Sequence, residues 1–183
     1  ASKNYHFMNE SVKKFGLQFG LYITLINTLY IIVGYAIDLT YLVSAWGGSF
    51  LIVASLTLLV LATIQARKEM GGFIDFKDAF STFMTAFVVY SLANILLSYV
   101  LFVVVDPEAA AQLKDITIQT TAERLQSFGV PEADMDAAIE ELQNTDQYSL
   151  TNLLKGFGYS FVFYAVIGLI VSAIVKKKNP EVI

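Results

Sequence analysis

The sequence predicts an all-α integral membrane protein, a four-helix bundle with a small extracytoplasmic helical hairpin between its third and fourth helices. The 183 residues are 56% hydrophobic and only 15% charged, whereas soluble domains carry about 25% charged residues. Four apolar stretches are long enough to cross a hydrocarbon core of about 30 Å, which takes about 20 helical residues. A strongly acidic segment separates the last two stretches.

We expect one membrane domain over residues 1–183, with a hairpin over residues 106–147 and spans at about 15–37, 41–65, 78–105 and 152–175. The first apolar run is longer than the roughly 7–15 residues of a signal peptide, so we interpret it as a true span. Residues 38–40 form a very short turn, which makes the first two spans antiparallel neighbours.

The third span has a well-marked start. Asp75 is predicted to be its N-cap, with Asp78 three residues later in the position of a capping-box acid. A cation site formed by these two carboxylates is the alternative. Capping explains the spacing without a ligand, so we prefer it.

The acidic segment after this span is predicted to be helical. Asp106 followed by Pro107 is typical of a helix start, because Asp caps the helix and Pro at the first helical position needs no N–H. Gly129 is expected to end this helix, and Pro131 precedes a second, amphipathic one.

This segment contains ten of the sixteen acidic residues, against Lys114 and Arg124. One interpretation is a docking surface for a basic or cationic partner, formed by Asp134, Asp136, Glu140 and Glu141. The alternative is a solvated acidic face over a small apolar stripe, which is the more common role of a charge run.

Within the spans, polar and small residues are predicted to serve helix packing. Four polar residues, expected to make interhelical contacts near the middle of the membrane, are Asn27, Ser91, Asn94 and Ser98. Asn27 and Asn94 should face the bundle interior and could pair there. Glycines let helix backbones approach closely, and the packing positions are Gly16, Gly20, Gly47, Gly48 and Gly168.

The basic residues predict the topology, because loops rich in Lys and Arg stay in the cytoplasm. Nine of the twelve fall on one side, namely Lys3, Lys13, Lys14, Arg67, Lys68, Lys77, Lys176, Lys177 and Lys178. The other three are Lys114, Arg124 and Lys155. Both termini and residues 65–76 are therefore expected in the cytoplasm, and the acidic hairpin on the opposite side.

Three short motifs carry a family resemblance. They are Gly-Phe-Ile-Asp-Phe-Lys-Asp-Ala-Phe at residues 72–80, Asp-Pro-Glu at 106–108 and Gly-Val-Pro-Glu-Ala-Asp-Met at 129–135. With these motifs and a last span ending in lysines, the chain resembles the bacterial membrane-protein family called domain of unknown function 4199, found mainly in Bacteroidota. The resemblance implies a four-helix protein of the bacterial inner membrane. Together with the topology expected from the basic residues, this would place residues 106–147 in the periplasm. It supplies no catalytic residues, because the family has no assigned activity.

The residue inventory restricts the function classes. Without cysteine and with His6 as the single histidine, the chain offers no thiolate or histidine-based metal site. We find no catalytic constellation and expect neither an enzyme nor a cofactor. An acidic membrane protein is also an unsuitable nucleic-acid binder. We expect a structural or accessory subunit in contact with membrane lipids and other membrane proteins. A small oligomeric transporter or channel is the alternative, and homo-oligomerisation stays open.

Overall fold

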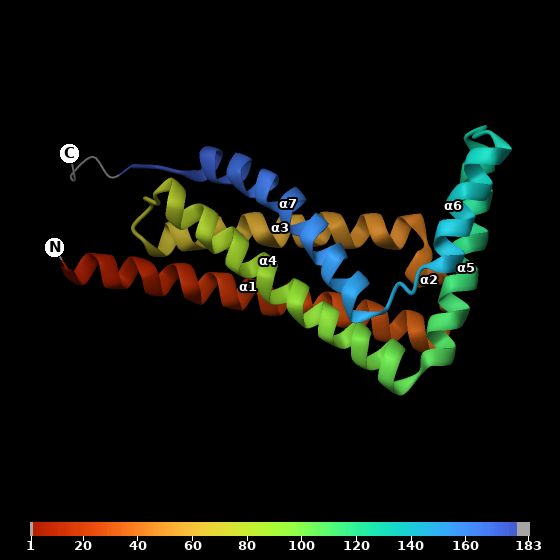
Figure 1. Ribbon diagram of the computed structural model, residues 1–183. Coiled ribbons are helices and arrows are strands. Elements are labelled where there is room, and N and C mark those ends of the chain that lie inside the picture. The colour runs from red at the N-terminus through yellow and green to blue at the C-terminus, as the bar shows by residue number, and fades with distance from the viewer. Residues whose placement is uncertain (1, 179–183) are drawn as a thin grey trace. The chain divides into compact units, whose positions relative to one another are not determined.

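A computed structural model describes the backbone of residues 2–178 and the side chains of residues 10–178. The described residues are 87% helical and contain no strand. Four helices are long and apolar enough to cross a membrane (Figure 1), at Glu10–Ile37, Ala45–Glu69, Phe76–Val105 and Leu150–Val175. The predicted all-α membrane fold is therefore confirmed. The side chains of Lys3 and His6 lie outside the described set.

The elements follow one another as α1 (Ser2–Ile37), α2 (Thr40–Val43), α3 (Ala45–Glu69), α4 (Phe76–Tyr99), the π-helical turn η1 (Val100–Val105), α5 (Pro107–Ser127), α6 (Glu132–Asn144) and α7 (Leu150–Val175). The described chain divides into two compact units. Unit 1 contains residues 2–27, 51–94 and 157–178, and unit 2 contains Thr28–Phe50 and Ile95–Gly156.

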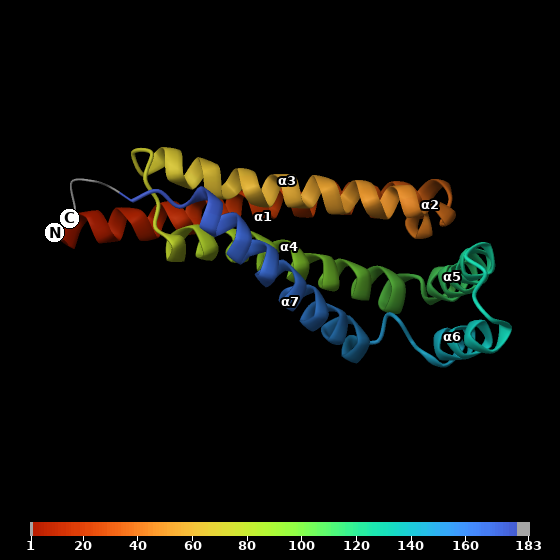
Figure 2. The ribbon, with the colours of Figure 1, turned by 90° about the horizontal axis from the view of Figure 1, so that it is seen from above.

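Unit 1 is a four-helix bundle, in which segments of α1, α3, α4 and α7 surround an apolar core (Figure 2). Ile23 of α1, Leu59 of α3 and Phe87 of α4 have no exposed surface, and Tyr164 of α7 is 8% exposed. In a membrane, helices associate through close packing rather than through a hydrophobic driving force. The fit of these side chains is therefore what holds unit 1 together.

Unit 2 has its own small core. Phe102 of η1 and Leu113 of α5 are buried there, and the Phe102 ring lies 4.6 Å from the Tyr148 ring, centroid to centroid. Arg124 of α5 donates a hydrogen bond to the Val43 carbonyl of α2 at 3.0 Å. This contact joins α5 to the turn that follows α1.

The second membrane helix begins later than the expected residue 41. The short helix α2 ends at Val43, and Ser44 has an extended backbone with ψ of 137°. The Ser44 hydroxyl then accepts a hydrogen bond from the Gly47 N–H at 3.1 Å. Ser44 is thus the N-cap of α3, and this cap sets the start of the helix at Ala45.

The third membrane helix ends in a π-helical turn that sequence patterning did not predict. The Asp106 N–H donates to the Leu101 carbonyl, five residues earlier, at 2.8 Å. Four of the six η1 residues are valines, whose β-branched side chains fit an α-helix slightly less well than unbranched ones. The turn brings the chain to Asp106, where α5 begins.

Candidate functional site

The start of α5 is built around Asp106. Its carboxylate accepts a hydrogen bond from the Ala109 N–H at 2.9 Å, and Pro107 occupies the first turn, which confirms the predicted cap. The Tyr35 hydroxyl of α1 donates to the same carboxylate at 2.7 Å. The Ala109 N–H first, and the Tyr35 hydroxyl second, hold the pKa of Asp106 below its usual range.

A groove of about 560 Å³ adjoins this cap within unit 2. Its polar lining includes Asp38, Asp106 and Gln112. The Thr40 N–H donates to Asp38 at 2.8 Å and lowers the pKa of that carboxyl group. Both carboxylates are therefore ionised at neutral pH, and both already accept hydrogen bonds from the protein. The arrangement stabilises the junction between α1 and α5 without a ligand.

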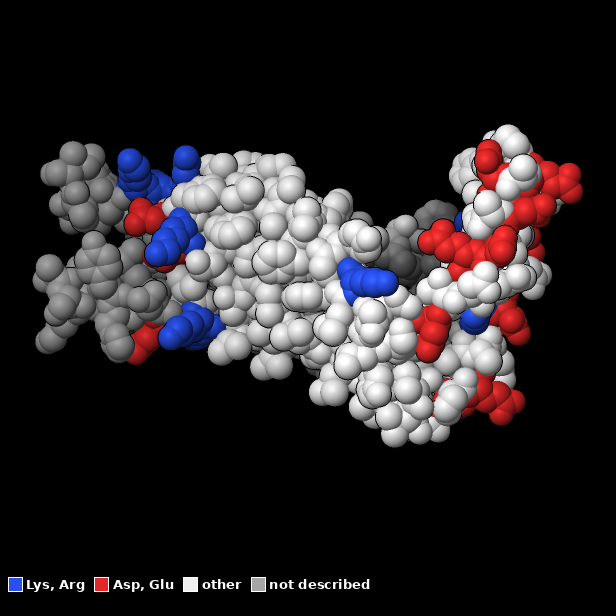
Figure 3. Space-filling model, in the orientation of Figure 1, with Lys and Arg blue, Asp and Glu red and all other residues white. Residues whose placement is uncertain are grey.

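The acidic residues singled out from the sequence lie on α6. All four are exposed, namely Asp134, Asp136, Glu140 and Glu141. Figure 3 shows red side chains covering α5 and α6. Lys114 donates to the Gln143 carbonyl, and Arg124 donates to the Val43 carbonyl. The two basic residues of this region thus bind backbone oxygens, and the four carboxylates of α6 are exposed to solvent.

The polar residues singled out within the spans lie on α1 and α4. Asn27 is 7% exposed and donates its amide to the Ile23 carbonyl of its own helix at 2.9 Å. Ser91, Asn94 and Ser98 are half-buried on α4. A pair between Asn27 and Asn94 stays a prediction.

Buried hydroxyl groups of unit 1 also bind to their own helices. Ser172 donates to the Gly168 carbonyl at 2.6 Å, Thr82 to the Asp78 carbonyl at 2.8 Å and Thr63 to the Val60 carbonyl at 2.7 Å. Such bonds satisfy the hydroxyl within one turn of helix. In the described residues, no buried side-chain nitrogen or oxygen lacks a hydrogen-bond partner.

Several of the packing glycines lie against a neighbouring helix. A Cβ at Gly16 would lie 2.7 Å from the Thr85 Cβ of α4, and one at Gly168 would lie 2.9 Å from the Phe83 ring. A Cβ at Gly47 would overlap the Tyr30 hydroxyl in unit 2. By contrast, a Cβ at Gly48 would meet no atom of the described chain within 4 Å.

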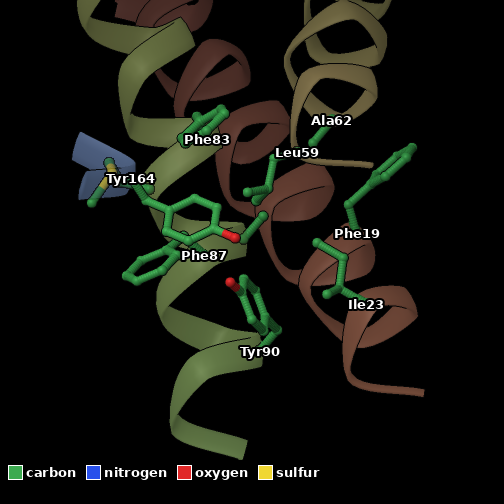
Figure 4. Packing of buried hydrophobic residues seen from close by; sticks show 10 residues of the cluster. Phe19, Ile23, Leu59, Ala62, Phe83, Phe87, Tyr90 and Tyr164 are labelled. Carbon is green, nitrogen blue, oxygen red and sulfur yellow. The ribbon is translucent and has the colours of Figure 1, made fainter. Parts of the chain in front are cut away.

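An aromatic cluster inside unit 1 was missed by sequence reasoning. The Phe87 and Tyr164 rings stack with centroids 4.7 Å apart. The hydroxyls of Tyr90 and Tyr164 point toward each other (Figure 4). The sequence does contain a signal for this cluster: Phe83, Phe87 and Tyr90 follow the i, i+4, i+7 spacing of one helix face.

Residues 14–177 match the family model described as Protein of unknown function (DUF4199). The resemblance predicted from the three short motifs is therefore confirmed. Comparison with curated proteins and with solved structures gave no significant match.

Proposed function

We propose a function for this chain from the premise that it belongs to the DUF4199 family of proteins of unknown function. We infer that it is a non-catalytic accessory subunit of the bacterial inner membrane, which packs against other membrane proteins. Its partners would be membrane lipids and protein subunits, without a cofactor or nucleic acid.

One observation carries this proposal: several buried polar side chains of unit 1 bind their own helix backbones. Asn27, Thr82 and Ser172 each donate to a carbonyl four residues earlier. A transporter or channel needs polar groups that can bind a substrate or ion along a pathway. Groups that are already satisfied in this way favour a packed structural core over such a pathway.

Exposed features offer surfaces for a protein partner. Gly156 and Gly158 of α7 are exposed, and a Cβ at either position would meet nothing within 4 Å. A helix of another protein can approach closely at such small residues. The exposed carboxylates of α6 would contribute to the same assembly by attracting a basic partner.

The proposed orientation follows from the charges at the helix ends. Lys14, Arg67, Lys77 and Lys176 lie at or just beyond the ends of membrane helices, which favours a cytoplasmic location for both termini. Residues 106–147 would then be periplasmic.

Cysteine labelling tests this orientation, because the chain has no native cysteine. In intact cells, an impermeant thiol reagent should label Asp136→Cys and spare Met70→Cys. The reverse pattern would overturn the proposed orientation.

Purification in a mild detergent, followed by mass spectrometry, tests the proposed role. A stoichiometric membrane-protein partner should co-purify. Asp136→Asn combined with Glu140→Gln should weaken that association, whereas the charge-matched control Asp115→Asn with Glu123→Gln should keep it. A chain that purifies alone and conducts ions in liposomes would refute the accessory role.

A further inference from the structure

One end of unit 1 gathers basic side chains from separate segments of the chain. In Figure 3, several blue side chains lie at that end, with red side chains among them. We call this set the basic rim, and its members are Arg67, Lys68, Lys77, Lys176, Lys177 and Lys178. Arg67 is half-buried, and the five lysines are exposed.

The backbone of the basic rim is held in place by an isolated antiparallel bridge. The Ile74 N–H donates to the Lys177 carbonyl at 3.0 Å, and the Lys177 N–H donates to the Ile74 carbonyl at 2.9 Å. Ile74 is 1% exposed and packs in a buried cluster with Ala66 and Val175. The lysines after α7 are thus fixed across the loop between α3 and α4.

That loop is shaped by the end of α3. The Gly72 N–H binds the Arg67 carbonyl at 2.9 Å, and the Gly71 N–H binds the Lys68 carbonyl at 3.2 Å. This is the Schellman pattern, and Gly71 and Gly72 have φ of 76° and 90°, which favours glycine. The two glycines turn the chain so that Ile74 meets Lys177.

Two donors of the basic rim are oriented by contacts within the protein. The Arg67 guanidinium donates to the Val175 carbonyl at 3.2 Å, which leaves most of its five N–H groups for another acceptor. The Lys177 ammonium lies 5.5 Å from the centre of the Phe73 ring. Of the acids near the rim, Glu69 is paired with Lys14 at 3.0 Å, and Asp75 and Asp78 lie at the start of α4 on either side of Lys77.

The position of the rim along the helices indicates which anion it would meet. α3 ends at Glu69, α4 begins at Phe76 and α7 ends at Val175, so the rim lies where three membrane helices leave the hydrocarbon. Just inside, Ile174 is 75% exposed. An acyl chain can lie against this apolar surface while a headgroup reaches the lysines.

We propose that the basic rim binds the phosphate of an anionic phospholipid, with Arg67 as an oriented donor and Lys176 and Lys177 as charged partners. Guanidinium and ammonium groups bind phosphate oxygens through charge-assisted hydrogen bonds. A lipid fits better than a soluble anion because the site lies at headgroup depth beside exposed apolar surface. Basic pockets between membrane helices are known to bind such headgroups.

Native mass spectrometry of the purified full chain with added phosphatidylglycerol or phosphatidylcholine of the same acyl chains tests the proposal. The chain should retain phosphatidylglycerol preferentially. Lys176→Gln combined with Lys177→Gln should weaken that retention about thirtyfold. The bridge uses only backbone atoms of Lys177, so the variant should keep its fold. The charge-matched control, Lys114→Gln with Lys155→Gln, should bind like the wild type.

Three results would overturn the proposal. One is equal retention of the two lipids by the wild type. Another is an equal loss of phosphatidylglycerol in the rim variant and in its control. The third is displacement of phosphatidylglycerol by inorganic phosphate at the same concentration, because the rim would then be a site for a soluble anion.

Discussion

α1 and α4 approach each other closely at Gly20, and a single methyl group tests that contact. A Cβ at Gly20 would lie 2.7 Å from the Val89 Cβ and 2.9 Å from the Ala86 carbonyl oxygen. Ala86 has no exposed surface, and a backbone oxygen cannot move aside as a flexible side chain can. Gly20→Ala should therefore push the two helices apart.

Two opposing contributions determine how much Gly20→Ala should change the free energy of unfolding. Replacing Gly by Ala in a helix interior stabilises the helix by up to about 1 kcal/mol. Forcing an additional methyl group into a packed core costs about 1–3 kcal/mol. Because one of the contacts is with backbone, we expect a net loss of about 1–2 kcal/mol in the free energy of unfolding. In the control Gly48→Ala, where a Cβ meets nothing within 4 Å, only the stabilising contribution remains.

Titration with sodium dodecyl sulfate in mixed micelles measures the unfolding midpoint of both variants. A cysteine at Ala62, which has no exposed surface, would report unfolding through its reaction with a thiol reagent, since the chain has no other cysteine. The unfolding midpoint should fall for Gly20→Ala and stay or rise for Gly48→Ala. Midpoints that shift together, in the same direction and to the same extent, would refute the close approach of α1 and α4.

Other contacts give predictions for the same titration. Tyr35→Phe removes the hydroxyl that donates to Asp106 and should cost about 0.5–1.5 kcal/mol, so an unchanged midpoint would contradict that bond. The folded-state pKa of Asp106 is lowered, so its contribution to stability is complete above its ordinary pKa of 3.8 and is lost as the pH falls through the folded value. In Asp106→Asn, the unfolding temperature should fall less at acidic pH than it does in the wild type. The same pH dependence in both proteins would argue against the role of Asp106. Phe87→Ala should cost about 3–5 kcal/mol because it leaves a cavity beside Tyr164. Phe50→Ala, at a position 62% exposed, should cost much less, and equal costs would contradict the assigned core.

Local sequence signals predicted the parts of the fold that depend on neighbouring residues. The Asp106 cap of α5 and the helix stop at Gly129, which has φ of 69°, follow from side-chain and backbone preferences within one turn. Membrane-length helices follow from apolar runs. Each of these features involves residues only a few positions apart, so composition and spacing are sufficient.

Features that join distant segments were not predictable in this way. The bridge between Ile74 and Lys177, and the bond from Tyr35 to Asp106, connect residues that only the folded chain brings together. Ser44 was part of the expected second span, although its hydroxyl caps α3. A serine within an apolar run gives no clear local signal, because it can equally bond to the preceding turn of a helix.

The distribution of charge connects the two proposals and keeps them separable. The basic rim belongs to unit 1, whereas the exposed acids of α6 belong to unit 2. Inside unit 1, the buried polar groups of Asn27 and Ser172 are satisfied by their own helices, so recognition by charge is left to the exposed surfaces. These surfaces have opposite signs and therefore require different partners, a basic protein for α6 and an anionic headgroup for the rim. Neutralising one surface should leave binding at the other intact, because each surface attracts a partner of the opposite charge to its own.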